Sequence, residues 1–247
     1  WQNFGIVKNH GVDASLTLNQ KIGQVNLSAR GNFTFARNEI IEYDQVPQVY
    51  PWLEKRGTRL NSNKLYIAEG LYTYDDFIIN GEGLNRTYEL KPGVVSGLSS
   101  GVRPGDIKYK DQNGDGIIDA EDEIAIGRSN YPELVYGLNL NAEWKGFDIT
   151  FFFQGAALAD FYYNGYLAFP YIEGRGGALL EHHIGNTWTP ENPKAEFPRL
   201  YYGGNANNQL FSSFWMRNGS YLRLKNVEIG YDLSLIHISE PTRPRLI

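Results

Sequence analysis

The chain has 247 residues, with 23 Lys and Arg against 28 Asp and Glu, four His and no Cys. The absence of cysteine excludes a disulfide-stapled scaffold and a Cys-ligated zinc module. The net charge of −5 argues against a nucleic acid as the partner. Aromatic residues and glycines are abundant beside a single Met, a composition that favours strands and turns over packed helices. We therefore predict an all-β protein.

The two ends of the chain differ from the rest. No stretch near Trp1 has the form of a signal peptide, so we expect a mature piece or an internal fragment. No apolar run approaches the ~20 residues of a membrane-spanning helix. After Leu233 the alternation of aliphatic, aromatic and polar residues stops, and the sequence resembles translated sequencing-adapter DNA. We expect residues 1–233 to carry the fold and residues 234–247 to be a non-native tail, with a natural Pro-rich tail as the alternative.

A long β-hairpin is predicted near the start of the chain. Apolar residues alternate with polar ones from Val12 to Leu18 and again from Val25 to Arg37, around a turn at Gln20 to Gly23. Such alternation gives each strand one apolar and one polar face. The second strand, at about 13 residues, exceeds the usual ~5–6 of globular strands and is long enough for a tilted membrane crossing.

An acidic loop follows in the middle of the chain. The stretch from Asp111 to Glu123 contains six acids and no Lys or Arg, so the remainder of the chain is close to neutral. Its spacing follows the twelve-position calcium loop, in which several oxygens surround a hard cation and a glycine, here Gly116, makes the sharp turn. The predicted ligands are Asp111, Asn113, Asp115, the carbonyl of Ile117, Asp119 through a water molecule, and Asp122.

Two features of the acidic loop depart from that pattern. Position 12 is Asp122 rather than Glu, which shortens the reach of a bidentate ligand, and residues 106–110 look extended rather than helical. The alternative is a solvated loop in which Asn113-Gly114 and Asp115-Gly116 form turns. We predict structural calcium as the cofactor, bracing a long exposed loop.

A second hairpin and a last strand follow. Tyr136 to Trp144 and Phe147 to Phe153 alternate around a tight turn at Lys145-Gly146. In the last strand, Leu222 and Leu224 have one parity and the later apolar residues have the other. This change at Lys225-Asn226 predicts a β-bulge.

Two architectures account for such hairpins. In a soluble sandwich the apolar face packs on a second sheet, whereas in an outer-membrane barrel it faces lipid and the polar face lines the lumen. Short turns at one end and long connections at the other favour the barrel. Those connections are 38–64, 80–131 and 155–220. We predict a partial antiparallel transmembrane β-barrel with long extracellular loops; the alternative is a secreted, calcium-stabilised β-sandwich that binds carbohydrate.

No enzymatic site is evident. The chain lacks a nucleophile elbow, a phosphate loop and a His-Glu-x-x-His motif. His182 and His183 are adjacent, and we expect two surface histidines rather than a metal pair. Aromatic residues of the long connections could stack on sugars or grip a partner, but we expect most to pack loop on loop. We therefore predict that the protein is not an enzyme.

A series of motifs runs in a fixed order along the chain from Pro104 to Val227. The series consists of Pro104 to Asp111, Asn113 to Gly116, Ile118-Asp119, Ile126-Gly127, Tyr131 to Leu134, Tyr136 to Asn139, Lys145 to Asp148, Phe152 to Gly155 and Tyr221 to Val227. In this order the motifs closely resemble the C-terminal barrel region of SusC/RagA-type TonB-dependent transporters, and the resemblance covers Gly5 to Leu233.

That resemblance implies part of a plugged barrel of about 22 strands in the outer membrane of a Gram-negative bacterium. It implies import of glycan or peptide fragments, driven by TonB through an N-terminal part that is missing here, beneath a SusD-like surface lipoprotein. It assigns no substrate residue. The plug, the first strands and the native C-terminal strands are also missing, so we expect the 247-residue chain alone neither to fold stably in lipid nor to transport.

Overall fold

The computed structural model describes residues 4–97, 101–172 and 177–232, so the expected tail at 234–247 lies outside the described residues. The fold is all-β and its strands pair antiparallel; the described part contains short 3-10 turns but no α-helix. Nothing in that part is a helix of the length and apolarity needed to span a membrane. Contacts divide the chain into two units, which we call the sheet unit (Gly11–Ala36, Glu133–Ala157 and the chain from Ser220) and the loop unit (the chain to His10, Arg37–Pro132 and Leu158–Gly219).

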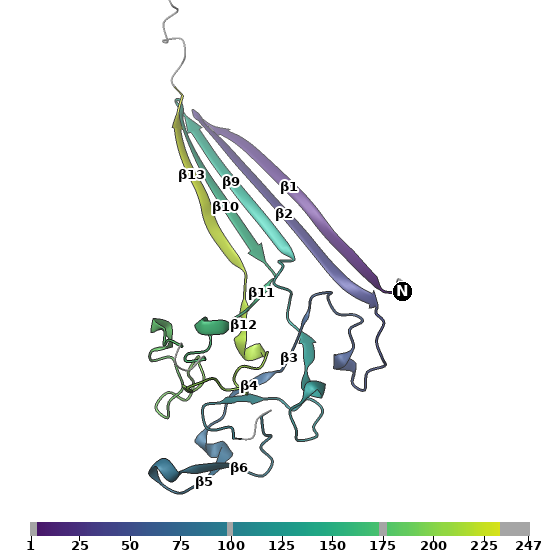
Figure 1. Cartoon of the computed structure of the whole chain (residues 1–247). Helices are drawn as coiled ribbons and strands as arrows, with labels where there is room; N and C mark the ends of the chain where they lie inside the picture. Colours follow the sequence, from purple (N-terminus) through teal and green to yellow (C-terminus); the bar gives the residue numbers. More distant parts are fainter. Residues whose placement is uncertain (1–3, 98–100, 173–176, 233–247) are drawn as a thin grey trace, which may run out of the picture. The chain divides into compact units, whose positions relative to one another are not determined.

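Five long strands lie side by side in one sheet (Figure 1). In spatial order they are β1 (Ile6–Ile22), β2 (Val25–Glu42), β9 (Leu134–Trp144), β10 (Phe147–Ala157) and β13 (Tyr221–Tyr231). Both predicted hairpins are present, and the turn at Lys145-Gly146 is confirmed. Both of its residues have positive φ, 48° and 84°, the conformation whose twist matches that of paired strands.

The first hairpin is longer than predicted. Its turn lies at Gly23-Gln24 rather than at Gln20 to Gly23, because β1 continues to Ile22. The second strand continues beyond Arg37 to Glu42. Its extension is held by backbone hydrogen bonds, since Ile40 donates to the Thr58 carbonyl at 2.9 Å and accepts from Gly57 at 2.8 Å. The alternation of apolar and polar residues within one strand does not reveal a partner that lies outside that strand, such as Thr58.

The predicted β-bulge in β13 is confirmed. Asn226 pairs with Phe152 and Leu224 pairs with Phe153, so Lys225 is the extra residue. Because one residue is left over, apolar residues of opposite parity on either side of Lys225 share one face of the sheet.

The register gives the sheet one apolar and one polar face. Trp144, Phe147 and Tyr231 form a cross-strand row next to the hairpin turn, and Leu140, Phe151 and Val227 form another row on the same face. On this face several large apolar side chains are exposed, from 37% at Leu140 to 75% at Ile229, while Ile149 and Phe151 are half-buried. Within the described residues of the sheet unit no second sheet packs over those side chains, so the single five-stranded sheet fits the barrel prediction better than the β-sandwich alternative.

The long connections are folded rather than merely irregular. Four short antiparallel pairs order them: β3 (Asn63–Leu65) with β8 (Ile124–Ile126), β4 (Ala68–Leu71) with β7 (Ile107–Tyr109), β5 (Phe77–Asn80) with β6 (Thr87–Leu90), and β11 (Asp160–Tyr162) with β12 (Met216–Asn218). The 3-10 turns are η1 (Pro51–Leu53), η2 (Tyr74–Asp76), η3 (Gly83–Asn85), η4 (Ala120–Asp122), η5 (Gly165–Leu167), η7 (Glu181–His183) and η8 (Ser213–Trp215). The extended stretch expected at 106–110 is β7.

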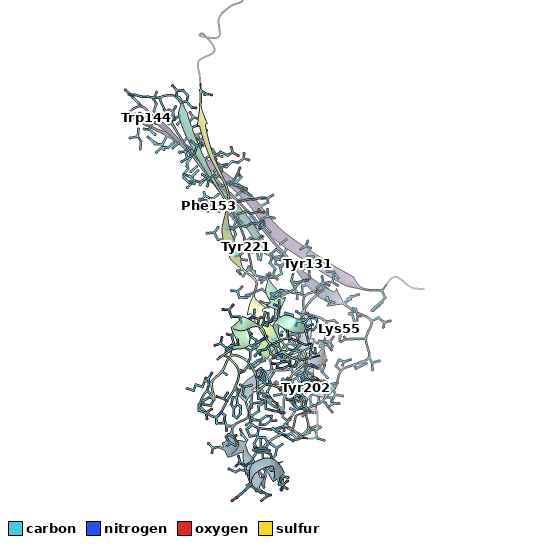
Figure 2. The ribbon with its side chains drawn as sticks, turned by 60° about the vertical axis from the view of Figure 1, so that its left-hand side comes forward. Lys55, Tyr131, Trp144, Phe153, Tyr202 and Tyr221 are labelled. Atoms are coloured by element: carbon cyan, nitrogen blue, oxygen red, sulfur yellow. The ribbon has the colours of Figure 1, made fainter. Side chains whose placement is uncertain are left out.

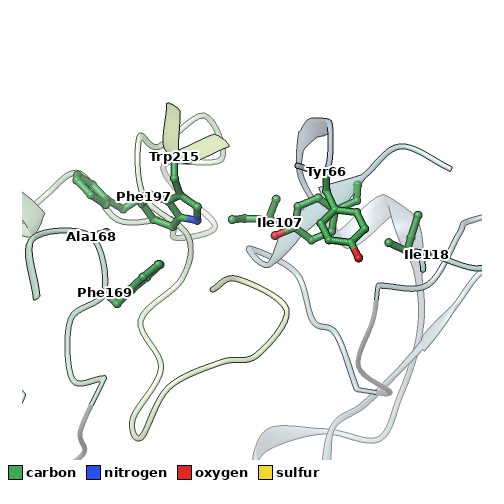
Figure 3. Packing of buried hydrophobic residues seen from close by; sticks show 8 residues of the cluster. Tyr66, Ile107, Ile118, Ala168, Phe169, Phe197 and Trp215 are labelled. Atoms are coloured by element: carbon green, nitrogen blue, oxygen red, sulfur yellow. The ribbon is translucent and has the colours of Figure 1, made fainter. Parts of the chain in front are cut away.

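The loop unit has its own aromatic core (Figure 3). Trp215 is fully buried and meets the ring of Phe169 edge-on, with 4.9 Å between ring centroids. Tyr109 is also buried, and its hydroxyl donates to the Asn207 carbonyl at 2.6 Å. These rings thus pack loop on loop, as expected for most aromatic residues of the long connections. Tyr202, by contrast, is 67% exposed.

Candidate functional site: the acidic loop, a buried carboxylate and the polar sheet face

Backbone N–H groups hold the carboxylates of the acidic loop. The two oxygens of Asp111 accept from Gly114 at 2.6 Å and from Gly116 at 2.7 Å. Those of Asp122, a residue only 1% exposed, accept from Gln112 at 2.6 Å and from Asp119 at 2.9 Å. Each bond places a carboxylate against a positive amide dipole, so the loop is folded around its own acids.

The remaining predicted ligands follow the same arrangement. Asn113 accepts from the Asp115 amide at 3.1 Å, and Asp115 accepts from the Ile117 amide at 2.8 Å. The Asp119 carboxylate caps η4 by accepting from Glu121 at 2.8 Å. Residues 111–122 therefore form linked side-chain turns, the arrangement expected of the solvated-loop alternative.

The donor atoms of the acidic loop are of the kind that a hard cation prefers, but the distances between its side chains do not suit one. Carboxylate, amide and carbonyl oxygens are the donors that Ca²⁺ prefers, and each carboxylate oxygen has a second lone pair beside the one already used. Within the described residues, however, no three His, Asp or Glu side chains lie close enough together to hold a metal ion. Calcium remains a prediction.

The charge of the acidic loop acts on a neighbouring phenol. Burial, reinforced by the negative charges of Glu123, Asp119 and Asp122, raises the pKa of Tyr66 to about 12. Tyr66 belongs to the aromatic core of the loop unit, so the pKa of a side chain in that core depends on the charge of the acidic loop.

A second carboxylate, Asp106, is buried without belonging to the acidic loop. It is 1% exposed and receives the guanidinium of Arg199, whose Nε lies 2.8 Å from Oδ1. The side chains of Asn205 and Asn208 each donate to the same oxygen at 2.9 Å, and the Arg103 amide donates to Oδ2 at 2.8 Å. A buried charge is tolerated when it is paired and hydrogen-bonded in this way.

The Asp106 cluster orders the strand that follows it. Asn208 accepts from the Ile107 amide at 2.8 Å, and Asn207 donates to the Ile107 carbonyl at 2.8 Å. Segments about one hundred residues apart in sequence are thereby joined. Sequence reasoning missed this cluster, although the asparagines at 205, 207 and 208, so close together in an apolar-aromatic stretch, were the available signal.

The histidine pair differs from expectation. His183 is fully buried rather than a surface residue. Its Nδ1 accepts from the Leu180 amide at 3.3 Å, and the Nε2 atoms of both histidines lie 2.8–2.9 Å from the Leu167 carbonyl. Because a carbonyl only accepts, Nε2 of His183 carries hydrogen while its Nδ1 accepts, so His183 is a neutral core residue. Burial, together with the nearby His182, lowers the pKa of His183.

On three neighbouring strands, β9, β10 and β13, the charges of the polar face differ in sign along the strand direction. Glu143 pairs with Asp148 in the row next to the hairpin turn, and Glu228 lies in the following polar row, opposite Thr150. Farther from the turn the charges are Arg223 and Lys225. Figure 2 shows Trp144 at the turn end and Tyr221 at the other end of these strands.

The sequence has curated relatives, although no family model matches it. It is 28% identical over 237 residues to TonB-dependent receptor P26 of Formosa agariphila, a match that covers 94% of this chain and 23% of the relative. It is 23% identical over 239 residues to TonB-dependent receptor SusC of Bacteroides thetaiotaomicron, covering 93% of this chain and 21% of SusC. The chain thus spans less than a quarter of the length of these relatives.

Solved structures agree with the sequence relatives. The fold resembles the RagAB peptide importer in its closed-closed state with a TM-score of 0.58 and 25% identity, over 93% of this chain and 23% of that chain. The RagAB peptide transporter gives a TM-score of 0.57 at 24% identity, with the same coverage. The predicted resemblance is confirmed: the chain is similar to part of SusC/RagA-type TonB-dependent transporters, and its antiparallel sheet matches part of their barrel, which the described residues do not close.

Proposed function

We propose that this chain supplies part of the wall and the outward loops of an active importer in the outer membrane of a Gram-negative bacterium. We call the complete protein the parent transporter. Residues 1–233 belong to the C-terminal portion of its barrel, and the plug and first strands lie elsewhere in it. It imports glycan or peptide fragments, is energised by TonB and works with a SusD-like surface lipoprotein.

The observation that carries this proposal is the exposed apolar face of the sheet. From Leu134 to Trp144, β9 has 11 residues, which span roughly 33 Å along the strand and roughly 25 Å across a membrane at a tilt of about 40°. That height matches the apolar band of outer-membrane barrels. The aromatic row of Trp144, Phe147 and Tyr231 stands at the turn end, where rings sit at a membrane–water interface.

The comparisons support the cargo and partner to different degrees. The RagAB structures are described as a peptide transporter or importer, which favours peptides. Glycans and the SusD-like lipoprotein rest on the resemblance to the SusC/RagA family. Relatives that are receptors and transporters also favour a role without bond-making chemistry.

Localisation and energy coupling test this function together. The parent transporter, expressed in its own cells, is expected in the outer-membrane fraction, and deletion of its gene is expected to abolish growth on one class of glycan or peptide. A strain that lacks TonB function should show the same growth defect. Recovery of the protein in a soluble fraction, or uptake that is independent of TonB, would contradict the proposal.

We also propose that the acidic loop binds calcium as a structural brace. Calorimetry of the detergent-purified parent transporter should show binding at or below millimolar calcium, and Asp111→Asn with Asp115→Asn should abolish it. Glu123→Gln, outside the twelve positions, is the matched control. Bound calcium should also offset the carboxylate charge beside Tyr66 and lower its pKa from about 12, which ultraviolet titration measures. Absence of heat with the unmodified protein would remove the calcium proposal.

A further inference from the structure

Two cationic side chains converge on one neutral oxygen on the polar face of the sheet. The Nζ of Lys225 lies 3.1 Å from Oε1 of Gln154, and an Nη atom of Arg223 lies 3.5 Å from the same atom. We call these three residues the basic clasp. Both cations come from β13 and the amide comes from β10, so all three belong to the sheet unit.

The basic clasp lacks a counter-charge among the residues the structure describes. Neither Arg223 nor Lys225 forms an ion pair within that part of the chain. The nearest acid along β13 on this face, Glu228, accepts from Asn226. Gln154 offers a single oxygen to both cations, so the two positive charges are held close together without neutralisation.

The surroundings of the clasp are aromatic. The Arg223 guanidinium lies 5.5 Å from the ring centroid of Tyr221, and Nζ of Lys225 lies 6.0 Å from that of Phe152. These rings limit the directions open to the flexible cations. The bulge contributes as well, because Lys225 has no partner across the ladder and its side chain turns to the polar face.

We propose that the basic clasp binds a carboxylate group of the transported solute. This inference rests on the proposed function, in which the polar face lines the lumen. A carboxylate accepts from an ammonium and a guanidinium at once, and such charge-assisted bonds are the strong ones. Within β9, β10 and β13 the acids of this face, Glu143, Asp148 and Glu228, stand nearer the hairpin turn, so on these three strands the positive charge that attracts an anionic solute is at the clasp.

Transport of a matched pair of peptides tests the clasp. The parent transporter is compared with its Arg223→Gln/Lys225→Gln variant, using N-acetyl-trialanine with a free C-terminal carboxylate and the same peptide as an amide. The variant should import the acid about tenfold less well, the effect of losing a charge-assisted contact, and the amide as before. Lys145→Gln, which removes a cation from the hairpin turn, should change neither.

A deletion provides a second variant. Removing Lys225 leaves Asn226 and Leu224 opposite their present partners, so the clasp loses a cation while the wall keeps its register. It should also weaken import of the acid but not of the amide. Equal loss of both peptides in the two variants, or no loss of either, would overturn the inference.

Chemical protection separates failure of the clasp from failure of the proposed function. In the purified parent transporter, saturating N-acetyl-trialanine should slow acylation of Lys225 by an amine-reactive ester about tenfold, as measured by mass spectrometry. The amide should not protect Lys225, and neither peptide should protect Lys145. Protection without import would contradict peptide transport and support the clasp. Import of acid and amide alike, with no protection, would support transport and overturn the clasp.

Discussion

At the scale of single residues, Gly105 explains the sequence Pro-Gly-Asp before β7. Its φ is +89°, and a Cβ there would lie 2.4 Å from the Trp188 ring and 2.9 Å from Cβ of Arg199. Arg199 is the cation that pairs with Asp106. Glycine thus lets the chain pass close to the indole while it delivers the buried carboxylate to its partner.

We expect Gly105→Ala to destabilise the loop unit by about 3 kcal/mol, through backbone strain and overpacking. Gly114→Ala is the matched control, because Gly114 has a φ of +81° but nothing within 4 Å of its Cβ position; only the strain of about 1 kcal/mol should remain. Thermal dependence of proteolysis within residues 37–132 of the parent transporter measures both. Equal effects would show that contact with Trp188 is unimportant.

His183 makes the loop unit sensitive to acid. Its pKa is lowered from the ordinary 6.5 in the folded protein, so below that pH the unfolded chain binds more protons than the folded one. The stability that neutral His183 contributes is complete above about 6.5 and is lost as pH falls toward the lowered pKa. Hydrogen exchange of the Leu180 region, corrected for intrinsic rates, should reveal more opening at pH 5 than at pH 7.5.

Two variants separate this effect from general acid sensitivity. His183→Gln should remove the pH dependence between 5 and 7.5, whereas His182→Gln should leave a smaller one, since His182 helps lower the pKa of His183 and a folded-state pKa nearer 6.5 leaves less stability to lose. An unchanged pH profile in His183→Gln would refute the assignment.

Residue-level prediction from sequence succeeds only where the determinants are local. The calcium-type spacing is local, and its residues do form a single loop. Asp106 pairs with Arg199, a residue 93 positions away, and no spacing rule connects them. His183 illustrates the same limit, because its burial depends on the Leu167 carbonyl, 16 positions earlier.

At the scale of elements, the two faces of β10 carry phenylalanines with different neighbours. Phe151 lies in the apolar row with Leu140 and Val227, whereas its neighbour Phe152 lies in the polar row with Asn139 and Asn226. Phe151 and Phe152 are thus identical side chains on opposite faces of one strand, near the middle of its 11 residues.

We expect Phe151→Glu to destabilise the barrel of the parent transporter by about 2 kcal/mol, the order of cost of a carboxylate on the lipid face near the midplane. Phe152→Glu should be tolerated, because the polar face is wet and Lys225 lies nearby. Urea titration of the folded, heat-modifiable band in lipid vesicles compares the two. Greater damage from Phe152→Glu would reverse the assignment of faces.

Alternation predicted both hairpins, the tight turn and the bulge, because each depends on side chains only one or two residues apart. It did not predict that β2 runs to Glu42 or that the connections form four short strand pairs. Those elements are held by partners outside their own sequence, such as Thr58 for Ile40. Strands of three or four residues also give too few alternations to recognise.

At the scale of the whole molecule, the sheet has two open edges. In the described structure β1 pairs only with β2, and β13 pairs only with β10. Lipid offers no hydrogen bonds to such an edge, and each unsatisfied backbone group costs several kcal/mol. The sheet therefore depends on further strands to close it.

We expect the 247-residue chain alone to fail to refold in detergent or lipid vesicles, while the parent transporter refolds under the same conditions. The measurement is electrophoresis with and without heating, which distinguishes a closed barrel from unfolded chain, together with light scattering. A monodisperse, heat-resistant species from the 247-residue chain would show that its edges are satisfied in another way.

Fold class and family were predictable from the sequence because the two-residue period and the ordered motifs extend over most of the chain. The substrate was not, since the loop unit that would meet it is held by long-range contacts such as those of Asp106 and Trp215.

The bulge at Lys225 has a consequence for how this wall can change. Every other position in β13 lies on the apolar or the polar face by its parity, so a one-residue insertion or deletion there moves the side chains of part of the strand to the opposite face unless it is compensated. Lys225 is the exception, because the residues before and after it stay on the same face of the sheet whether or not Lys225 is present. The side chain at position 225 can therefore change, or the residue be lost, without moving the rest of β13 to the other face, so this is where the strand can vary in length.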